Sequence, residues 1–138
     1  MMQLVRSLNL ESYVEVLPRV GRVEAMRWTA AAQVCVVLPQ DSRMALPSKV
    51  FELAQLRSWL LVFASPDSAT ASALNGTGAT VVAPTDERGA TAALHRAILA
   101  FRAGERPPRA DSAGLMLRSQ QVEKLQAHLD RITATAIR

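Results

Sequence analysis

Four short apolar stretches, rich in valine, leucine and alanine, constrain the fold of this chain more than any other feature of its sequence. They span residues 14–17, 34–38, 60–64 and 79–83. Three of them are continuous rather than alternating, and turn-forming residues bound them. Strands covered by helices on both faces, as in a parallel sheet, have this pattern. The stretches therefore predict four strands of a parallel sheet.

Helical patterns or helix-start residues mark the segments between these stretches. The expected helices cover residues 1–10, 23–32, 48–57, 68–74 and 89–103. Strands that alternate with helices at this spacing predict βαβ units. We expect a Rossmann-like α/β domain of three layers over residues 1–104, with about four parallel strands that pair in chain order.

The remaining residues predict a connector and a final helix. Residues 105–118 contain proline, glycine and serine and are expected to form the connector. A helix is expected within residues 119–138, with an apolar stripe formed by Val122, Leu125, Leu129 and Ile132. We expect this helix to pack back on the domain or, in a larger enzyme, on a partner domain.

The loop after the second stretch ends in the segment with the clearest binding chemistry. Ligands of open parallel sheets bind beyond the carboxyl ends of the strands, at helix N-termini. The backbone N–H groups of Ser48, Lys49 and Val50 are candidates for binding a diphosphate, with the Lys49 ammonium as an added charge. Glu52 is a candidate acceptor for the hydroxyls of a ribose. The alternative interpretation is that Lys49 and Glu52 are ordinary solvated helix residues.

The same segment carries a resemblance to a known family. The string Pro-Ser-Lys-Val-Phe-Glu-Leu-Ala, residues 47–54, resembles the "Pro-Ser/Gly-Lys-x-Phe-Glu-Tyr-Leu-Ala" segment of retaining, group 1 bacterial glycosyltransferases with the GT-B fold. Residues 14–26, 32–38 and 65–86 are similar to other segments of that family, in the same order. The similarity covers most of residues 8–104.

The resemblance implies the C-terminal, donor-binding domain of such an enzyme, truncated at its N-terminus. In the family, the glutamate at the Glu52 position binds the ribose of a nucleotide sugar, and a hexose passes to an acceptor hydroxyl. The expected ligand is this nucleotide diphosphate sugar, as a substrate, with no metal and no cofactor. Arg43, in the same loop, is a secondary candidate for donor binding. The catalytic residues stay unassigned.

Two departures from the family pattern favour an inactive chain. Met44 occupies a position where the family often has an acidic residue near the donor sugar, and residues 56–59 replace a Gly-Lys/Arg-Pro segment. The family's first βα units, which hold the diphosphate, and its N-terminal acceptor domain are missing from this sequence. A non-catalytic remnant or interaction module with the same fold is the alternative. An unrelated flavodoxin-like receiver domain is disfavoured, because no aspartate ends a predicted strand.

Composition narrows the partners and the compartment. The formal net charge is +4 and the arginines are spread out, which argues against a nucleic-acid surface and leaves peripheral membrane contact open for a full enzyme. Cys35 is the only cysteine, which suits a reducing cytoplasm. His95 and His128 are too far apart in sequence for a metal pattern. An unpaired edge on the 34–38 strand is a candidate homodimer surface.

Overall fold

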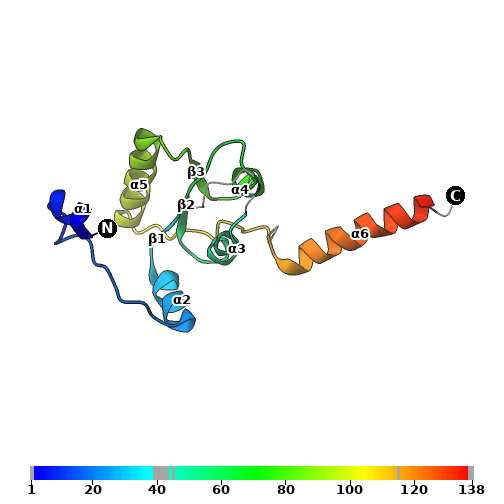
Figure 1. The fold of residues 1–138 in the computed structure, drawn as a ribbon, viewed down its shortest axis with the longest axis horizontal. Coiled ribbons are helices and arrows are strands. Elements are labelled where there is room, and N and C mark those ends of the chain that lie inside the picture. Colours follow the sequence, from blue (N-terminus) through cyan, green and yellow to red (C-terminus); the bar gives the residue numbers. More distant parts are fainter. Residues whose placement is uncertain (1, 39–43, 45, 115, 137–138) are drawn as a thin grey trace.

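The structure, a computed structural model, describes residues 2–38, 44, 46–114 and 116–136 and has an α/β architecture. In chain order its elements are α1 (Met2–Ser7), α2 (Arg22–Ala31), β1 (Val34–Val37), α3 (Ser48–Ala54), β2 (Trp59–Phe63), α4 (Ala69–Leu74), β3 (Thr80–Val82), α5 (Glu87–Arg102) and α6 (Arg118–Ala136) (Figure 1). The predicted alternation of strands and helices is therefore confirmed from residue 22 to residue 102.

The strands form one parallel sheet in the order β1-β2-β3. Val34 pairs with Trp59 at the start of the β1–β2 ladder, and Leu61 pairs with Thr80 at the start of the β2–β3 ladder. β2 is the central strand, and its residues 60–62 are buried. Its continuous apolar sequence follows from this position, because side chains on both of its faces meet helices.

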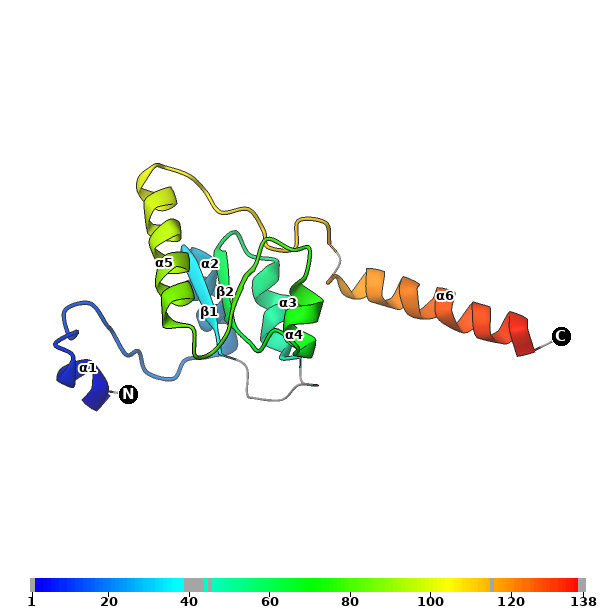
Figure 2. The same ribbon diagram turned by 90° about the horizontal axis from the view of Figure 1, so that it is seen from above.

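Helices cover both faces of the sheet (Figure 2). Cys35 and Val37 face the core that α3 and α4 complete with buried residues such as Val50 and Leu74. Val34 lies on the opposite face, beside Ala97 of α5. The alternation of side chains along β1 assigns its two faces to these two helical layers.

Side-chain caps begin α4 and α5. The Ser68 hydroxyl accepts a hydrogen bond from the Ala71 N–H at 3.1 Å, and the Asp86 carboxylate accepts one from the Gly89 N–H at 2.9 Å. Each cap satisfies an N–H group that has no partner within its helix. The helix predicted from residue 89 therefore begins two residues earlier, at Glu87.

The predicted strand at residues 14–17 does not form, so the prediction of four strands in chain order is wrong. The described sheet has three strands, and Val14, Val16 and Leu17 are exposed. Glu15 interrupts the apolar stretch. Since both faces of this sheet carry helices, a strand here would direct the Glu15 carboxylate toward one of these layers, where its burial costs free energy.

As a consequence, the outer edge of β1 has no neighbouring strand among the described residues. Val36 is 49% exposed, and Leu38 directly after the strand is 73% exposed. An uncovered edge of this kind can template pairing with another chain. Association of two copies through this edge remains a prediction.

The connector before α6 contributes to the core. Ala110 and Met116 are buried in the main apolar cluster. The Asp111 N–H donates to the Ala54 carbonyl at 2.9 Å, and the buried Asp111 carboxylate accepts from Gln55 Nε2 at 2.8 Å and from the Met116 N–H at 2.7 Å. This carboxylate therefore joins the end of α3 to the residues that precede α6.

The C-terminal helix was expected to pack on the domain or on a partner domain. The structure forms the helix, and its apolar stripe is exposed along its described length. Figures 1 and 2 show α6 extending away from the sheet and its helices in both views. The first of the two expected arrangements is not seen here, and packing on a partner domain stays a prediction.

We expect the Asp111→Ala substitution to lower the free energy of unfolding by about 2 kcal/mol, because the buried Met116 N–H and the partly buried Gln55 amide lose a charged acceptor. Chemical denaturation followed by circular dichroism measures this loss. Asp130→Ala, which removes an exposed carboxylate from α6, is the control and should stay within about 0.5 kcal/mol of the unsubstituted chain. Equal stability of the two variants would contradict the role given to Asp111.

Candidate functional site

The candidate site lies where α2 and α3 begin, at the carboxyl edge of the sheet. α3 follows β1 and leads back to the start of the parallel strand β2, so its first turn lies near the carboxyl ends of the strands. α2 leads into β1 through a short connection, so its first turn lies at the same edge. The topology therefore brings Arg22 close to Lys49 and Glu52.

Glu52 is the centre of this cluster. Its Oε1 lies 2.7 Å from an Arg22 guanidinium nitrogen, and its Oε2 lies 3.1 Å from Lys49 Nζ. The Glu52 side chain is 25% exposed, whereas the Arg22 and Lys49 side chains are 76% and 62% exposed. The carboxylate thus contacts two solvent-exposed cations and does not point into the apolar core.

The cations lower the pKa of Glu52 below its ordinary value of 4.5. The hydrogen bond from Lys49 contributes most, partial desolvation opposes it, and the charges of Arg22, Lys49 and Arg118 lower the pKa further. Arg118 is the first residue of α6, so three elements place a positive charge near one carboxylate. The cluster has a net positive charge and is suited to an anionic ligand.

The remaining predicted binding residues differ in their surroundings. Ser48 and Lys49 are exposed in the first turn of α3. The Val50 side chain is fully buried in the core, and the Val50 N–H donates to the Pro47 carbonyl at 3.0 Å. In this structure the Val50 amide therefore closes the first turn of the helix. Arg43 lies outside the described residues.

Sequence reasoning did not identify Arg22 or Arg118 as members of the site. Arg22 is 30 residues from Glu52 in the chain, and Arg118 lies beyond the connector. The order of the predicted helices and strands could have placed Arg22 at this site. Two helices that both precede a strand of one parallel sheet begin at the same edge, and Arg22 opens the first of them.

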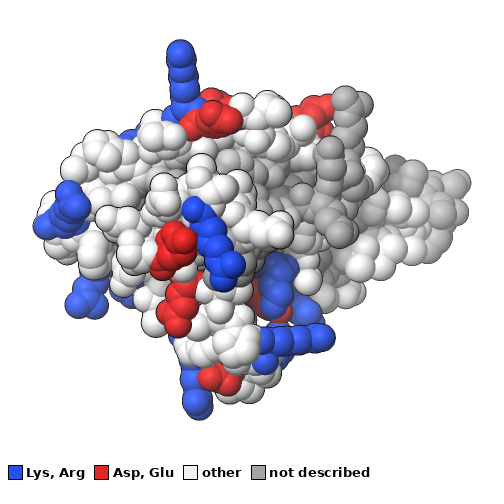
Figure 3. Space-filling view, turned by 60° about the vertical axis from the view of Figure 1, so that its left-hand side comes forward, with Lys and Arg blue, Asp and Glu red and all other residues white. Residues whose placement is uncertain are grey.

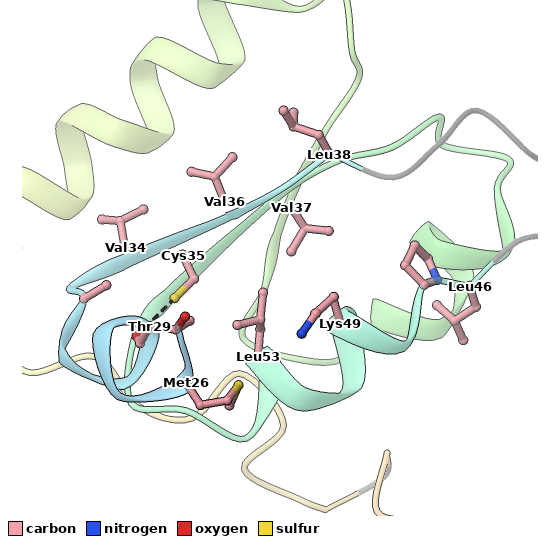
Figure 4. A pocket seen from close by; sticks show the side chains of 12 residues that line it. Met26, Thr29, Val34, Cys35, Val36, Val37, Leu38, Leu46, Lys49 and Leu53 are labelled. Atoms are coloured by element: carbon pink, nitrogen blue, oxygen red, sulfur yellow. Dashed lines mark hydrogen bonds between the residues drawn. The ribbon is translucent and has the colours of Figure 1, made fainter. Parts of the chain in front are cut away.

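An apolar trough of about 740 Å³ lies beside the cluster, along β1. Figure 4 shows Cys35 and Val37 pointing from β1 toward Thr29 and Leu53, with Lys49 on the α3 side. The Cys35 thiol donates to the Thr29 carbonyl at 3.7 Å. The trough offers apolar contacts to a ligand whose charged end meets Lys49.

Charge is mixed elsewhere on the surface. On the face shown in Figure 3, lysine and arginine side chains lie among aspartate and glutamate side chains rather than in one continuous basic field. Within the described parts of the chain, no three His, Cys, Asp or Glu side chains gather where they could hold a metal ion. None of the described helices combines the length and apolar character needed to cross a membrane.

Comparisons with protein-family models, with curated proteins and with solved structures find no match to this chain. The site must therefore be interpreted from its own residues. Its defining feature is a carboxylate paired with two cations at the carboxyl edge of a parallel sheet.

The pKa of Glu52 gives a direct test of this geometry. We expect its carboxyl group to titrate below 4.5, and Lys49→Met to raise the midpoint because the strongest stabilising partner of the anion is removed. Carbon-detected NMR of the side-chain carboxyl measures the midpoint. Lys124→Met, which removes an exposed lysine of α6, should leave it unchanged.

The sign of the pH effect follows from the lowered pKa. The ion pairs of Glu52 stabilise the fold above about pH 4.5 and are lost as the pH falls through the folded-state pKa. Their contribution should be small because both cations are exposed. A Glu52 midpoint above 4.5, or one that Lys49→Met leaves in place, would contradict the contact.

Proposed function

We propose that this chain is a Rossmann-like donor domain of the GT-B glycosyltransferase type, and that its cation cluster binds the nucleotide diphosphate part of a sugar donor. The observation that carries the proposal is the pairing of Glu52 with both Arg22 and Lys49. The resemblance of residues 47–54 to the family's donor-binding segment supports it independently of the geometry.

The chemistry of the cluster suits the two parts of such a ligand. The exposed guanidinium of Arg22 and ammonium of Lys49 can bind diphosphate oxygens, and the guanidinium can do so with two parallel hydrogen bonds. The Glu52 carboxylate can accept hydrogen bonds from vicinal ribose hydroxyls. The first turn of α3 adds the partial positive charge of a helix N-terminus, near Ser48.

The reaction implied is transfer of a hexose to an acceptor hydroxyl, with cations stabilising the departing diphosphate. In the proposed site these cations are side chains, with no metal ion. Met44 is exposed where the family often has an acidic residue near the sugar. We therefore propose weak donor binding without turnover. A cytoplasmic location, where a reduced Cys35 would be maintained, belongs to the same proposal.

The exposed stripe of α6 favours a second function, in which the domain serves as an interaction module. An uncovered apolar helix face is unusual for a domain that acts alone. Donor binding and protein interaction are compatible, since the stripe and the proposed donor site involve different residues.

Donor binding can be tested by calorimetry with UDP, GDP and ADP, and with inorganic pyrophosphate as the ligand that lacks a ribose. We expect Arg22→Gln to weaken all of them. We expect Glu52→Gln to weaken nucleoside diphosphates by about tenfold, the effect of one lost hydrogen-bonding group. The same substitution should leave pyrophosphate binding unchanged or tighter, because Arg22 and Lys49 lose a competing anion.

Glu24→Gln is the matched control, since Glu24 is an exposed glutamate of the first turn of α2. This substitution should change neither the affinity for nucleoside diphosphates nor the affinity for pyrophosphate. Equal weakening of nucleoside diphosphates and pyrophosphate by Glu52→Gln would refute the ribose contact. Hexose transfer from a nucleotide sugar by the purified 138-residue chain would refute the proposed inactivity.

A further inference from the structure

The apolar stripe of α6 has the spacing of a coiled-coil seam. Its members are Val122, Leu125, Leu129 and Ile132, which follow one another at intervals of three, four and three residues. Each is more than half exposed, with values from 52% to 61%. A stripe restricted to these two positions per seven residues is narrower than the face of a helix that packs on a domain core.

The seven-residue period covers every position from residue 121 to residue 134 of this helix. Residues 121–127 read Gln-Val-Glu-Lys-Leu-Gln-Ala, and residues 128–134 read His-Leu-Asp-Arg-Ile-Thr-Ala. Position by position, the two segments repeat polar, apolar, acidic, basic, apolar, polar and alanine. A period of seven keeps the seam aligned with a second supercoiled helix, whereas a straight helix drifts away from it.

The positions of the charges favour a second copy of the same helix as the partner. The side chains that flank the seam are Gln121, Gln126, His128 and Thr133, and none is a carboxylate, lysine or arginine. The acidic and basic residues of both segments lie on the outer side of the helix. Two identical helices can therefore pack together without bringing like charges into contact.

The same charges argue against an anionic membrane as the partner. Each repeat carries one acidic and one basic residue, so the helix between residues 121 and 134 has no excess of positive charge. Interfacial helices instead carry lysine and arginine in excess on their polar face. The apolar stripe here is also narrow for insertion into lipid.

The structure holds the start of α6 so that the seam stays accessible. Buried Met116 and the Asp111 carboxylate fix the residues before the helix. Gly114 adopts a φ of +70°, a backbone conformation that favours glycine at this turn. From this base α6 extends away from the rest of the molecule (Figures 1 and 2).

We propose that α6 is a dimerisation helix, and that two copies of this chain associate through a two-stranded coiled coil along Val122, Leu125, Leu129 and Ile132. The proposal does not depend on nucleotide binding. The seam has only two heptads, so the dimer is in exchange with the monomer and its population rises with concentration.

Sedimentation equilibrium of the full chain between about 10 µM and about 1 mM tests the proposal. We expect the dimer fraction to rise over this range. Leu125→Glu should weaken association by about 100-fold or more, because each dimer would bury two unpaired carboxylates. Ala127→Glu adds the same charge to the same helix on its outer side, and should associate like the unsubstituted chain.

At a concentration low enough for the unsubstituted chain to be monomeric, the unfolding transition of both variants should match that of the unsubstituted chain, since the described side chains of α6 past its first turn are exposed. A chain that stays monomeric over the whole concentration range would overturn the proposal. If that monomer bound phosphatidylserine vesicles, the partner of the stripe would be an anionic membrane instead. A dimer that Leu125→Glu leaves intact would also overturn it and would assign association to another surface, such as the edge of β1.

Discussion

The burial of β2 on both faces is the constraint on which the rest of the structure depends. Its residues Leu60, Leu61 and Val62 are nearly inaccessible to solvent. Both neighbouring strands pair with it, and the helices of both layers cover it. Polar side chains cannot replace these residues without burial costs, so the apolar sequence of this strand fixes the two-sided architecture. The carboxyl edge that carries the proposed site exists because the strands on both sides of β2 are parallel to it.

The parallel α/β architecture was predictable from sequence because its strands are continuous apolar stretches between helical segments. The failure at residues 14–17 has a physical cause. Glu15 lies within this apolar stretch, and a strand there would direct its carboxylate toward a face of the sheet that helices cover, where its burial costs free energy. The burial of Asp111 in the connector was also not predictable from the sequence. Asp111 lies in a proline-containing, polar segment, and only the returning chain path shows that its carboxylate is enclosed.

The candidate site was predictable only for the residues that lie on one helix. Lys49 and Glu52 lie one turn apart on one helix, so their proximity follows from the sequence alone. Arg22 and Arg118 enter through tertiary structure, from helices before and after the one that carries the glutamate. These arginines change the character of the site, because they turn a local Lys–Glu pair into a cluster with net positive charge. The proposed ribose contact rests on the local pair, and the proposed diphosphate contact rests mainly on the distant residues.

The return of the connector to the core also has a consequence for how the chain folds during synthesis. Ala110 and Met116 complete an apolar cluster whose other members lie between Ala32 and Val81, and Asp111 bonds to residues 54 and 55. A nascent chain that has emerged only as far as the end of α5 exposes the part of the core that these residues cover. The domain therefore closes late, after the strands and helices of its sheet have already been made. Until then, both the uncovered core and the outer edge of β1 are open to chaperones and to neighbouring nascent chains.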